Sequence, residues 1–531
     1  MELNIADLFE SLADAIPDHM ALVSGATRHT FADLDGRATR LANALAAQGI
    51  RAGDHVGLFL YNGHEFLEAM LAIFKIRAVP VNINYRYVEE ELAYLVTNAD
   101  LVALVAQREL LPRVDAVRAR TPMLRTVVVV GNGNLDGDGG RIDYEELLAS
   151  GSDARAFGER SGKDLYVIYT GGTTGMPRGV VWRHEDVFYA GLQGGNAGGE
   201  PLQRAEDLAP LVKSKEETIT YMPAAPFIHG AAQWAALICW FGGGKVVLSP
   251  GRSFDAKQAV RLMEREQVNT AILVGDAMVR PMVEALRERE HDLSALFVVV
   301  SAGAILSDVV KDELQERLPH AMILNNFGAS ETGHQGMVAF GEATDGKPTF
   351  AMDDTSTVLD DDGRSVTPGS GVVGRLARRG HLPVGYYKDP EKTAATFVTI
   401  DGERWVVPGD LATVLEDGRI QVFGRGAVCI NTGGEKVFPE EVESALKAHP
   451  GVADAVVVGV PDETWGQRVA AVVQPRPGAD LTLAALDAHC RTRVAGYKVP
   501  RQLALVETLV RHPSGKPDYR WAADAARSGR S

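Results

Sequence analysis

The sequence predicts an α/β protein with more than one domain, and three observations support this. Short β-rich runs alternate with helix-like segments through residues 31–130, and further β-rich runs follow between residues 245 and 300. Strands separated by helices form parallel sheets that are covered on both faces. The chain of 531 residues is also too long for one hydrophobic core. From about Thr357 the pattern becomes β-rich, and a further composition begins near Gly424.

The elements expected in the first 300 residues follow one another in a regular order. They are a helix over 31–49, a strand over 56–60, a helix over 65–76, and strands over 78–83, 101–105, 126–130, 165–168, 245–248, 270–274 and 296–300. Residues 191–217 are first glycine-rich and then charged. We expect that segment to be a surface insertion with little packed structure.

The last part of the chain predicts a small α+β module. A helix is expected around 440–443, and strands over 455–460 and 469–473. A length of about a hundred residues is typical of a small domain. We therefore expect two domains, an N-terminal domain over residues 1–424 and a C-terminal domain over residues 425–531.

The composition excludes several functional classes. The chain carries 54 Lys and Arg against 70 Asp and Glu, a net charge of −16, which argues against general nucleic-acid binding. The three cysteines form no C-x-x-C pair, so neither a disulfide framework nor a zinc site is expected. No signal peptide or run of membrane-spanning length is evident, so we expect a cytoplasmic protein without a membrane span. A homo-oligomer stays compatible with the sequence.

Residues 169–179, Y-T-G-G-T-T-G-M-P-R-G, are the most informative stretch of the chain. They follow an apolar, strand-like run, and glycines let successive N–H groups point into one concavity that binds phosphate oxygens. No G-K-[ST] follows at the Walker spacing. We favour a polyphosphate-binding loop over a flexible linker. Its candidate residues are Thr170, Gly171, Gly172, Thr173, Thr174, Gly175 and Arg178.

This stretch resembles the phosphate loop of the adenylate-forming superfamily, which includes acyl-CoA synthetases, luciferases and peptide-synthetase adenylation domains. The family loop usually reads T-S-G-T-T-G-x-P-K-G, and here Gly171 replaces the serine and Arg178 the lysine. Arginine is a bidentate phosphate partner. The resemblance covers nearly the whole chain. It implies a large N-terminal domain of parallel α/β subdomains plus a β-rich subdomain, with a small, mobile α+β C-terminal domain.

Two further segments resemble the family's nucleotide-binding elements. Asn326-Phe327-Gly328-Ala329-Ser330-Glu331 is similar to the Y-G-x-T-E element, and Ser301-Ala302-Gly303-Ala304 to the G-G-A-P loop along adenine and acyl group. The resemblance implies that Phe327 stacks on adenine and that Ser330 reaches the α-phosphate. Glu331, with Thr170, would hold Mg²⁺, which prefers few protein carboxylates.

The resemblance also assigns residues around the domain boundary. Asp410 matches the aspartate that accepts hydrogen bonds from both ribose hydroxyls, and Arg425 matches an arginine that contacts the nucleotide near the interdomain hinge. Gly434 and Lys436 fall in a region that flanks the pantetheine tunnel. The family commonly has Asp or Lys at the hinge, where this chain has Ala427. Small residues can also serve as hinges.

Lys516 and His229 complete the catalytic candidates, which are Lys516, Glu331, Thr170 and His229. Pro513-Ser514-Gly515-Lys516 resembles the C-terminal lysine motif. Adenylation brings a carboxylate against a phosphate, and a lysine between these anions offsets their repulsion. His229, in A-P-F-I-H-G, resembles the family histidine that gates the acyl or pantetheine site. A packing role for His229 remains the alternative.

Several short sequence motifs narrow the resemblance to actinobacterial acyl-CoA synthetases that activate steroid side-chain and long-chain carboxylates. Among them are W-R-H-E-D at 182–186, H-G-A-A-Q at 229–233 and G-K-P-D-Y-R-W at 515–521. The residues expected at the acyl group are His229, Gly230, Ala231, Val274, Gly275 and Ala302. Small residues leave room for a bulky acyl group, although they also permit close backbone packing.

The resemblance implies an ATP-dependent acyl-CoA synthetase. It would convert a carboxylate, ATP and CoA into acyl-CoA, AMP and pyrophosphate through an acyl-adenylate, with ATP, Mg²⁺ and CoA as cofactors. Two alternatives stay open. One is transfer of the acyl group to a carrier-protein thiol, and the other is a catalytically silent ATP-binding regulator.

Overall fold

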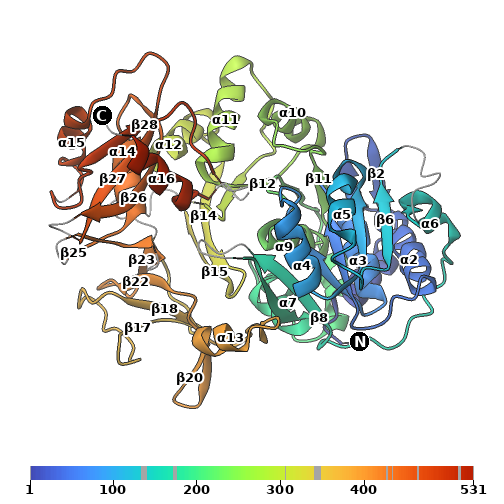
Figure 1. Cartoon of the computed structure of the whole chain (residues 1–531). Coiled ribbons are helices and arrows are strands. Elements are labelled where there is room, and N and C mark those ends of the chain that lie inside the picture. Colours follow the sequence, from blue (N-terminus) through green and yellow to red (C-terminus); the bar gives the residue numbers. More distant parts are fainter. Residues whose placement is uncertain are drawn as a thin grey trace.

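Four β-sheets form the framework of the described chain (Figure 1). The computed structural model describes residues 2–132, 140–170, 176–304, 306–339, 349–425, 428–432, 435–462, 466–494, 496–511 and 516–529. Two sheets have eight strands each, one has seven and one has five. Except for β19 (Gly385–Tyr386), the strands of the two eight-stranded sheets precede those of the other two sheets in the chain.

One eight-stranded sheet is built mainly from the first 183 residues. Its order is β19 (Gly385–Tyr386), β9 (Arg178–Arg183), β8 (Leu165–Thr170), β4 (Val79–Asn82), β3 (His55–Phe59), β5 (Leu101–Gln107), β6 (Thr126–Val130) and β7 (Ile142–Asp143). Neighbouring strands from β8 to β7 are parallel. The associated helices are α2 (Phe31–Ala47), α3 (His64–Lys75), α4 (Glu89–Asn98), η1 (Arg108–Leu110), α5 (Leu111–Arg118) and α6 (Tyr144–Ser150). Every residue of β3, β4 and β6 is buried, as expected for a covered parallel sheet.

The second eight-stranded sheet is also parallel except at its edges. Its order is β15 (Gly333–Ala339), β14 (Met322–Ala329), β13 (Val298–Ala302), β12 (Thr270–Leu273), β10 (Thr220–Pro223), β11 (Lys245–Leu248), β1 (Met20–Ser24) and β2 (Thr27–Thr30). Its helices are α1 (Ile5–Ala15), α7 (His184–Ala190), α8 (Leu208–Lys213), α9 (Gly230–Phe241), α10 (Ala256–Glu266), α11 (Gly275–Glu288) and α12 (Asp308–Arg317). The alternation in the sequence therefore predicted the fold class correctly.

The seven-stranded sheet is the expected β-rich part. It contains β16 (Thr349–Phe350), β23 (Ile420–Arg425), β22 (Asp410–Val414), β18 (Gly374–Arg378), β21 (Glu403–Val406), β20 (Phe397–Ile400) and β17 (Ser356–Leu359), and α13 (Pro390–Thr396) precedes β20. The strand pairs are antiparallel. This sheet lies beside the C-terminal part of the chain in Figure 1.

The five-stranded sheet forms the small α+β part. It contains β25 (Glu435–Val437), β24 (Ile430–Thr432), β27 (Gly466–Pro475), β26 (Val452–Asp462) and β28 (Gln502–Leu505), together with α14 (Pro439–Lys447), α15 (Leu483–Cys490) and α16 (Tyr519–Ser528). The expected domain boundary at 424/425 lies just before the last residue of β23, and the next described strand, β24, belongs to the five-stranded sheet. Within the described ranges, no helix is long and apolar enough to cross a bilayer.

The expectation of little packed structure over 191–217 is wrong. The segment contains η2 (Gln193–Gly195), η3 (Ala205–Asp207) and α8. Leu208 is fully buried, and Val212 is nearly so. A Cβ on Gly195, which has a φ of 72°, would lie 2.8 Å from the ring of Phe188. The glycines thus allow close packing, a role that composition does not distinguish from a flexible linker.

A buried charge cluster joins the first three helices. Lys75 is 1% exposed, and its Nζ lies 2.5 Å from Glu10 Oε1 and 2.7 Å from Asp35 Oδ1. Removing one partner of a buried ion pair leaves an uncompensated charge and costs about 3–5 kcal/mol. We expect Lys75→Met to lower the free energy of unfolding by about 3 kcal/mol, measured by urea denaturation. The loss lies at the lower end of this range because Arg155 still contacts Asp35 and Arg160 still contacts Glu10.

The matched control for this prediction is Lys392→Met, at an exposed position of α13. Surface changes usually alter stability by less than about 0.5 kcal/mol. Equal urea midpoints for the two variants would contradict a stabilising role for the buried Lys75.

Candidate active site

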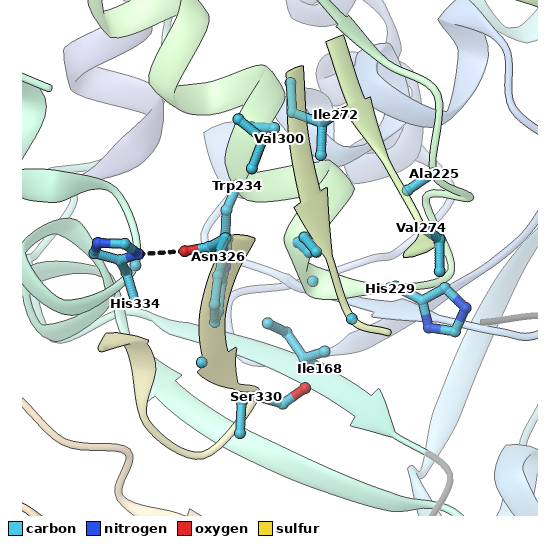
Figure 2. Close-up of a pocket in the computed structure, with 18 of the residues that line it drawn as sticks. Ile168, Ala225, His229, Trp234, Ile272, Val274, Val300, Asn326, Ser330 and His334 are labelled. Carbon is cyan, nitrogen blue, oxygen red and sulfur yellow. Dashed lines mark hydrogen bonds between the residues drawn. The ribbon is translucent and has the colours of Figure 1, made fainter. Parts of the chain in front are cut away.

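A cavity of about 500 Å³ brings together most of the described residues that the sequence predicted (Figure 2). This size is typical of small-molecule sites. It lies where β8, the face of the second sheet, α9 and the C-terminal part of the chain meet. The predicted residues that line it are Thr170, His229, Gly230, Ala231, Val274, Ala302, Gly303, Asn326, Gly328, Ser330 and Lys516.

Several predicted residues do not line the cavity. Glu331 is buried, and its Oε1 accepts a 2.9 Å hydrogen bond from the Tyr386 hydroxyl. The ring of Phe327 stacks on Phe350 with centroids 4.9 Å apart. Asp410 is buried at the start of β22. Their roles toward a nucleotide stay predictions.

Arg178 already has a protein partner. Its Nε lies 3.0 Å from Asp389 Oδ2, and the two side chains are 36% and 32% exposed. Exposed pairs of this kind contribute about 0–1 kcal/mol. A phosphate group can therefore compete with Asp389 for the guanidinium.

Gly275 and Ala304, predicted in the acyl and adenine loops, form hydrogen bonds through their backbone groups. The Gly275 N–H donates to Ser301 Oγ at 3.1 Å, and the Ser301 hydroxyl donates to the carbonyl of Ala304 at 3.2 Å. Gly303 has a φ of 80°, a conformation that favours glycine. Ser301 thus joins the two loops that follow β12 and β13.

The remaining predicted residues are outside the description. Gly171, Gly172, Thr173, Thr174, Gly175, Gly434 and the hinge position Ala427 are not among the described residues. For Arg425 and Lys436 only the backbone is described, at the end of β23 and within β25.

Asn82 is a structural residue of the site that we did not predict. Its Nδ2 donates to the carbonyls of Tyr169 at 2.8 Å and Ile228 at 2.6 Å, and its Oδ1 accepts from the Tyr169 N–H at 2.8 Å. It therefore ties the strand end before Thr170 to the segment before His229. The available signal was a polar side chain within the apolar run 78–83, because buried amides need partners.

His229 lies at the cavity as a neutral imidazole. Burial, together with the charges of Lys516 and Arg86, lowers the pKa of His229 to about 3. Its Nε2 is buried and forms no hydrogen bond with the part of the chain that the structure describes. Figure 2 shows the ring beside Val274. Lys516 lines the same cavity.

The C-terminal part is held against the second sheet by charged contacts that the sequence did not reveal. Lys447 Nζ in α14 lies 3.5 Å from Asp276 Oδ2 in α11 and 3.6 Å from Asp454 Oδ1 in β26. Burial alone would lower the pKa of Lys447, but Asp276 and Asp454 raise it above its usual value. Arg476 Nη2 also lies 3.9 Å from Glu313 Oε1 in α12. In this arrangement Lys516 reaches the cavity.

The fold and the site define an AMP-binding enzyme. The model of the family described as AMP-binding enzyme matches residues 9–387, and the model of the AMP-binding enzyme C-terminal domain matches residues 441–516. The chain belongs to this family.

Two relatives that are nearly 50% identical to the chain narrow the class of AMP-binding enzyme to CoA ligases. The chain is 48% identical over 535 residues to a medium/long-chain-fatty-acid–CoA/3-oxocholest-4-en-26-oate–CoA ligase of Mycolicibacterium smegmatis, covering 99% of this chain and 96% of the relative. It is 47% identical over 536 residues to a 3-oxocholest-4-en-26-oate–CoA ligase of Rhodococcus rhodochrous, with the same coverage. The protein is an ATP-dependent, AMP-forming acyl-CoA ligase.

A solved structure has the same arrangement over the whole chain. The ATP-bound MatB of Rhodopseudomonas palustris superimposes with a TM-score of 0.82 at 26% identity, covering 99% of each chain. The fold expected from the resemblance is therefore confirmed for both parts of the chain.

Proposed function

We propose that this acyl-CoA ligase activates medium- and long-chain fatty carboxylates and steroid side-chain carboxylates. The observation that carries the proposal is the cavity itself, which continues from Thr170, Ser330 and Lys516 into a space walled by Ile272, Val300 and other apolar side chains. The names of the relatives from Mycolicibacterium smegmatis and Rhodococcus rhodochrous agree with substrates of this kind.

In the first half-reaction the carboxylate attacks the α-phosphate of ATP, and pyrophosphate leaves. Lys516 bridges the two anions, which lowers their repulsion as they approach. Ser330 reaches the α-phosphate. The indole Nε1 of Trp182 donates to the Ser330 carbonyl at 2.9 Å, which supports this role by holding the Ser330 backbone at the cavity. Asp410 holds the ribose and Phe327 stacks on adenine, while Arg178 and the loop 171–175 bind phosphates.

Magnesium is the metal that this donor set fits. Glu331 offers one buried carboxylate and follows Ser330 in the sequence, and Ser330 lines the cavity together with Thr170. The Tyr386 hydroxyl donates a hydrogen bond to this carboxylate. Mg²⁺ prefers one or two carboxylates together with phosphate oxygens and water. Bound there, it would neutralise charge on the phosphates.

In the second half-reaction the CoA thiol replaces AMP. We propose that the C-terminal domain, residues 425–531, rotates about the region of Ala427, which withdraws Lys516 and brings Gly434 and Lys436 to a pantetheine path. His229, which is uncharged, gates this path without adding charge beside the thioester carbonyl. We further propose a cytoplasmic location, supported by three cysteines that are all free thiols.

The test is a panel of carboxylates in an ATP–pyrophosphate exchange assay, followed by addition of CoA or of a phosphopantetheine carrier protein. We expect exchange with long-chain and steroid acids, and thioester formation with CoA. Absence of exchange with every acid would contradict the proposal. Transfer to the carrier protein alone would identify a carrier-protein ligase instead.

A further inference from the structure

The deep part of the cavity follows one face of the second sheet. Side chains alternate along a strand, so every second residue of neighbouring strands shares a face. The lining residues obey this rule, and they are Thr270, Ile272 and Val274 on and after β12, Val298, Val300 and Ala302 on β13, and Leu324, Asn326 and Gly328 on β14. From Thr270 to Val274 this face extends about 13 Å at the usual rise per residue.

The opposite wall is one face of α9. Ala231, Trp234, Ala235 and Ile238 line the cavity at spacings of three and four residues, which place them on one side of a helix. Ala235 packs in one apolar cluster with Ile272 and Ala302. In Figure 2, Trp234 lies near Val300 and Ile272 on the facing strands. The acyl site is thus a slot between a flat sheet and a helix, a shape that suits a rigid, flat apolar group.

Two polar side chains line the slot at the end away from Lys516. Tyr221 and Thr270 are paired residues on the adjacent parallel strands β10 and β12, and both line the cavity. Thr270 begins β12, whereas Val274, Gly303 and Lys516 lie toward the opposite, carboxyl ends of the strands. Val298, which is paired with Thr270 on the neighbouring strand β13, and Ile238 on α9 are apolar lining residues. Two hydroxyls therefore lie next to apolar lining residues, at the end away from the adenylation chemistry.

The hydroxyls of Tyr221 and Thr270 can form a hydrogen bond to a third group. Each carries one donor and two acceptor sites, so a bond between them still leaves one donor for a third oxygen. Burial raises the pKa of Tyr221 to about 12, so the phenol keeps its proton and stays a donor. A buried polar group gains most from a partner when water is excluded.

We propose that Tyr221 and Thr270 select, among the carboxylates of the proposed function, rigid apolar acids that carry a ketone or hydroxyl oxygen at the end opposite the carboxyl group. The carboxyl group of such an acid meets Lys516, its ring system fills the slot between α9 and the sheet, and its far oxygen accepts a hydrogen bond from the pair. Acids without that oxygen bind in the same slot but make no such contact.

The experiment compares Thr270→Val and Tyr221→Phe with the wild type on a matched pair of substrates, a 3-oxo steroid side-chain acid and its 3-deoxy analogue. We expect kcat/KM for the 3-oxo acid to fall about fivefold in each variant, as for the loss of one hydrogen bond, and kcat/KM for the 3-deoxy acid to stay within about twofold. A saturated fatty acid of similar length should behave like the 3-deoxy acid.

Thr220→Val is the control variant. Thr220 precedes Tyr221 on β10 and is buried on the other face of the sheet. This variant should leave the ratio of the two kcat/KM values unchanged. An equal loss for both steroid acids in Thr270→Val and Tyr221→Phe, or no loss for either, would overturn the inference. A wild type that exchanges pyrophosphate with no acid would instead refute the proposed function.

Discussion

Replacing Lys516 with alanine is expected to abolish adenylation and to spare thioester formation. The lysine lines the cavity with Thr170 and Ser330, where we propose that the carboxylate approaches the α-phosphate. Loss of one preorganised charge-stabilising group typically lowers kcat by about 10²–10³. The first half-reaction is measured by pyrophosphate exchange, and the second by acyl-CoA formation from supplied acyl-AMP. The variant should lose the first activity by at least about a hundredfold and keep the second within about threefold.

Lys257→Ala is the matched control for this prediction. The Lys257 side chain is 58% exposed and pairs with Glu288 on the surface. Both half-reactions should proceed at wild-type rates in this variant. If Lys516→Ala lost the two activities equally, the lysine would not act specifically in adenylation.

Replacing Ala235 with phenylalanine is expected to convert the enzyme into one that accepts only short acids. Ala235 lies on the cavity side of α9, and a phenyl ring there enters the slot opposite Ile272. A steroid ring system can then no longer pass. We expect kcat/KM for steroid acids to fall more than about a hundredfold, which corresponds to about 2.7 kcal/mol of lost transition-state binding.

A short acid such as hexanoate serves as the internal control, since its chain ends before the ring. Its kcat/KM should stay within about threefold of the wild type, because pocket changes of a few methylenes are worth about 1–3 kcal/mol only where the substrate reaches them. Ala235→Val should give an intermediate loss for steroid acids. Equal losses for hexanoate and steroid acids would contradict the assignment of this slot to the acyl group.

The local patterns of the sequence predicted the fold well, because they depend on burial and period. The run Thr126–Val130 is β-branched and apolar throughout, and it forms β6 with every residue buried. Thr170 at the end of β8 and Asn326, Gly328 and Ser330 at the end of β14 line one cavity, although the two strands belong to different sheets.

Contacts between distant segments were not predictable from one sequence. Asn82 joins β8 to the His229 segment, and Lys447 joins α14 to Asp276 in α11. Neither residue belongs to a motif. The partners Ile228 of Asn82 and Asp276 of Lys447 are both more than a hundred positions away in the sequence. The prediction of little packed structure over 191–217 was wrong for a related reason. Glycine is as frequent in a loose loop as in a segment where backbone and side chains pack closely, so composition does not reveal the contacts.

The sequence by itself determined the class of reaction, because the groups that handle phosphate and charge are short motifs whose chemistry is carried by a few adjacent residues. Only the tertiary structure decided the form of the proposed acyl site. Its slot is made of every second residue of three strands and of residues three or four positions apart on one helix. Strand register, which the chain order does not state, brings Tyr221 and Thr270 together at the end away from Lys516.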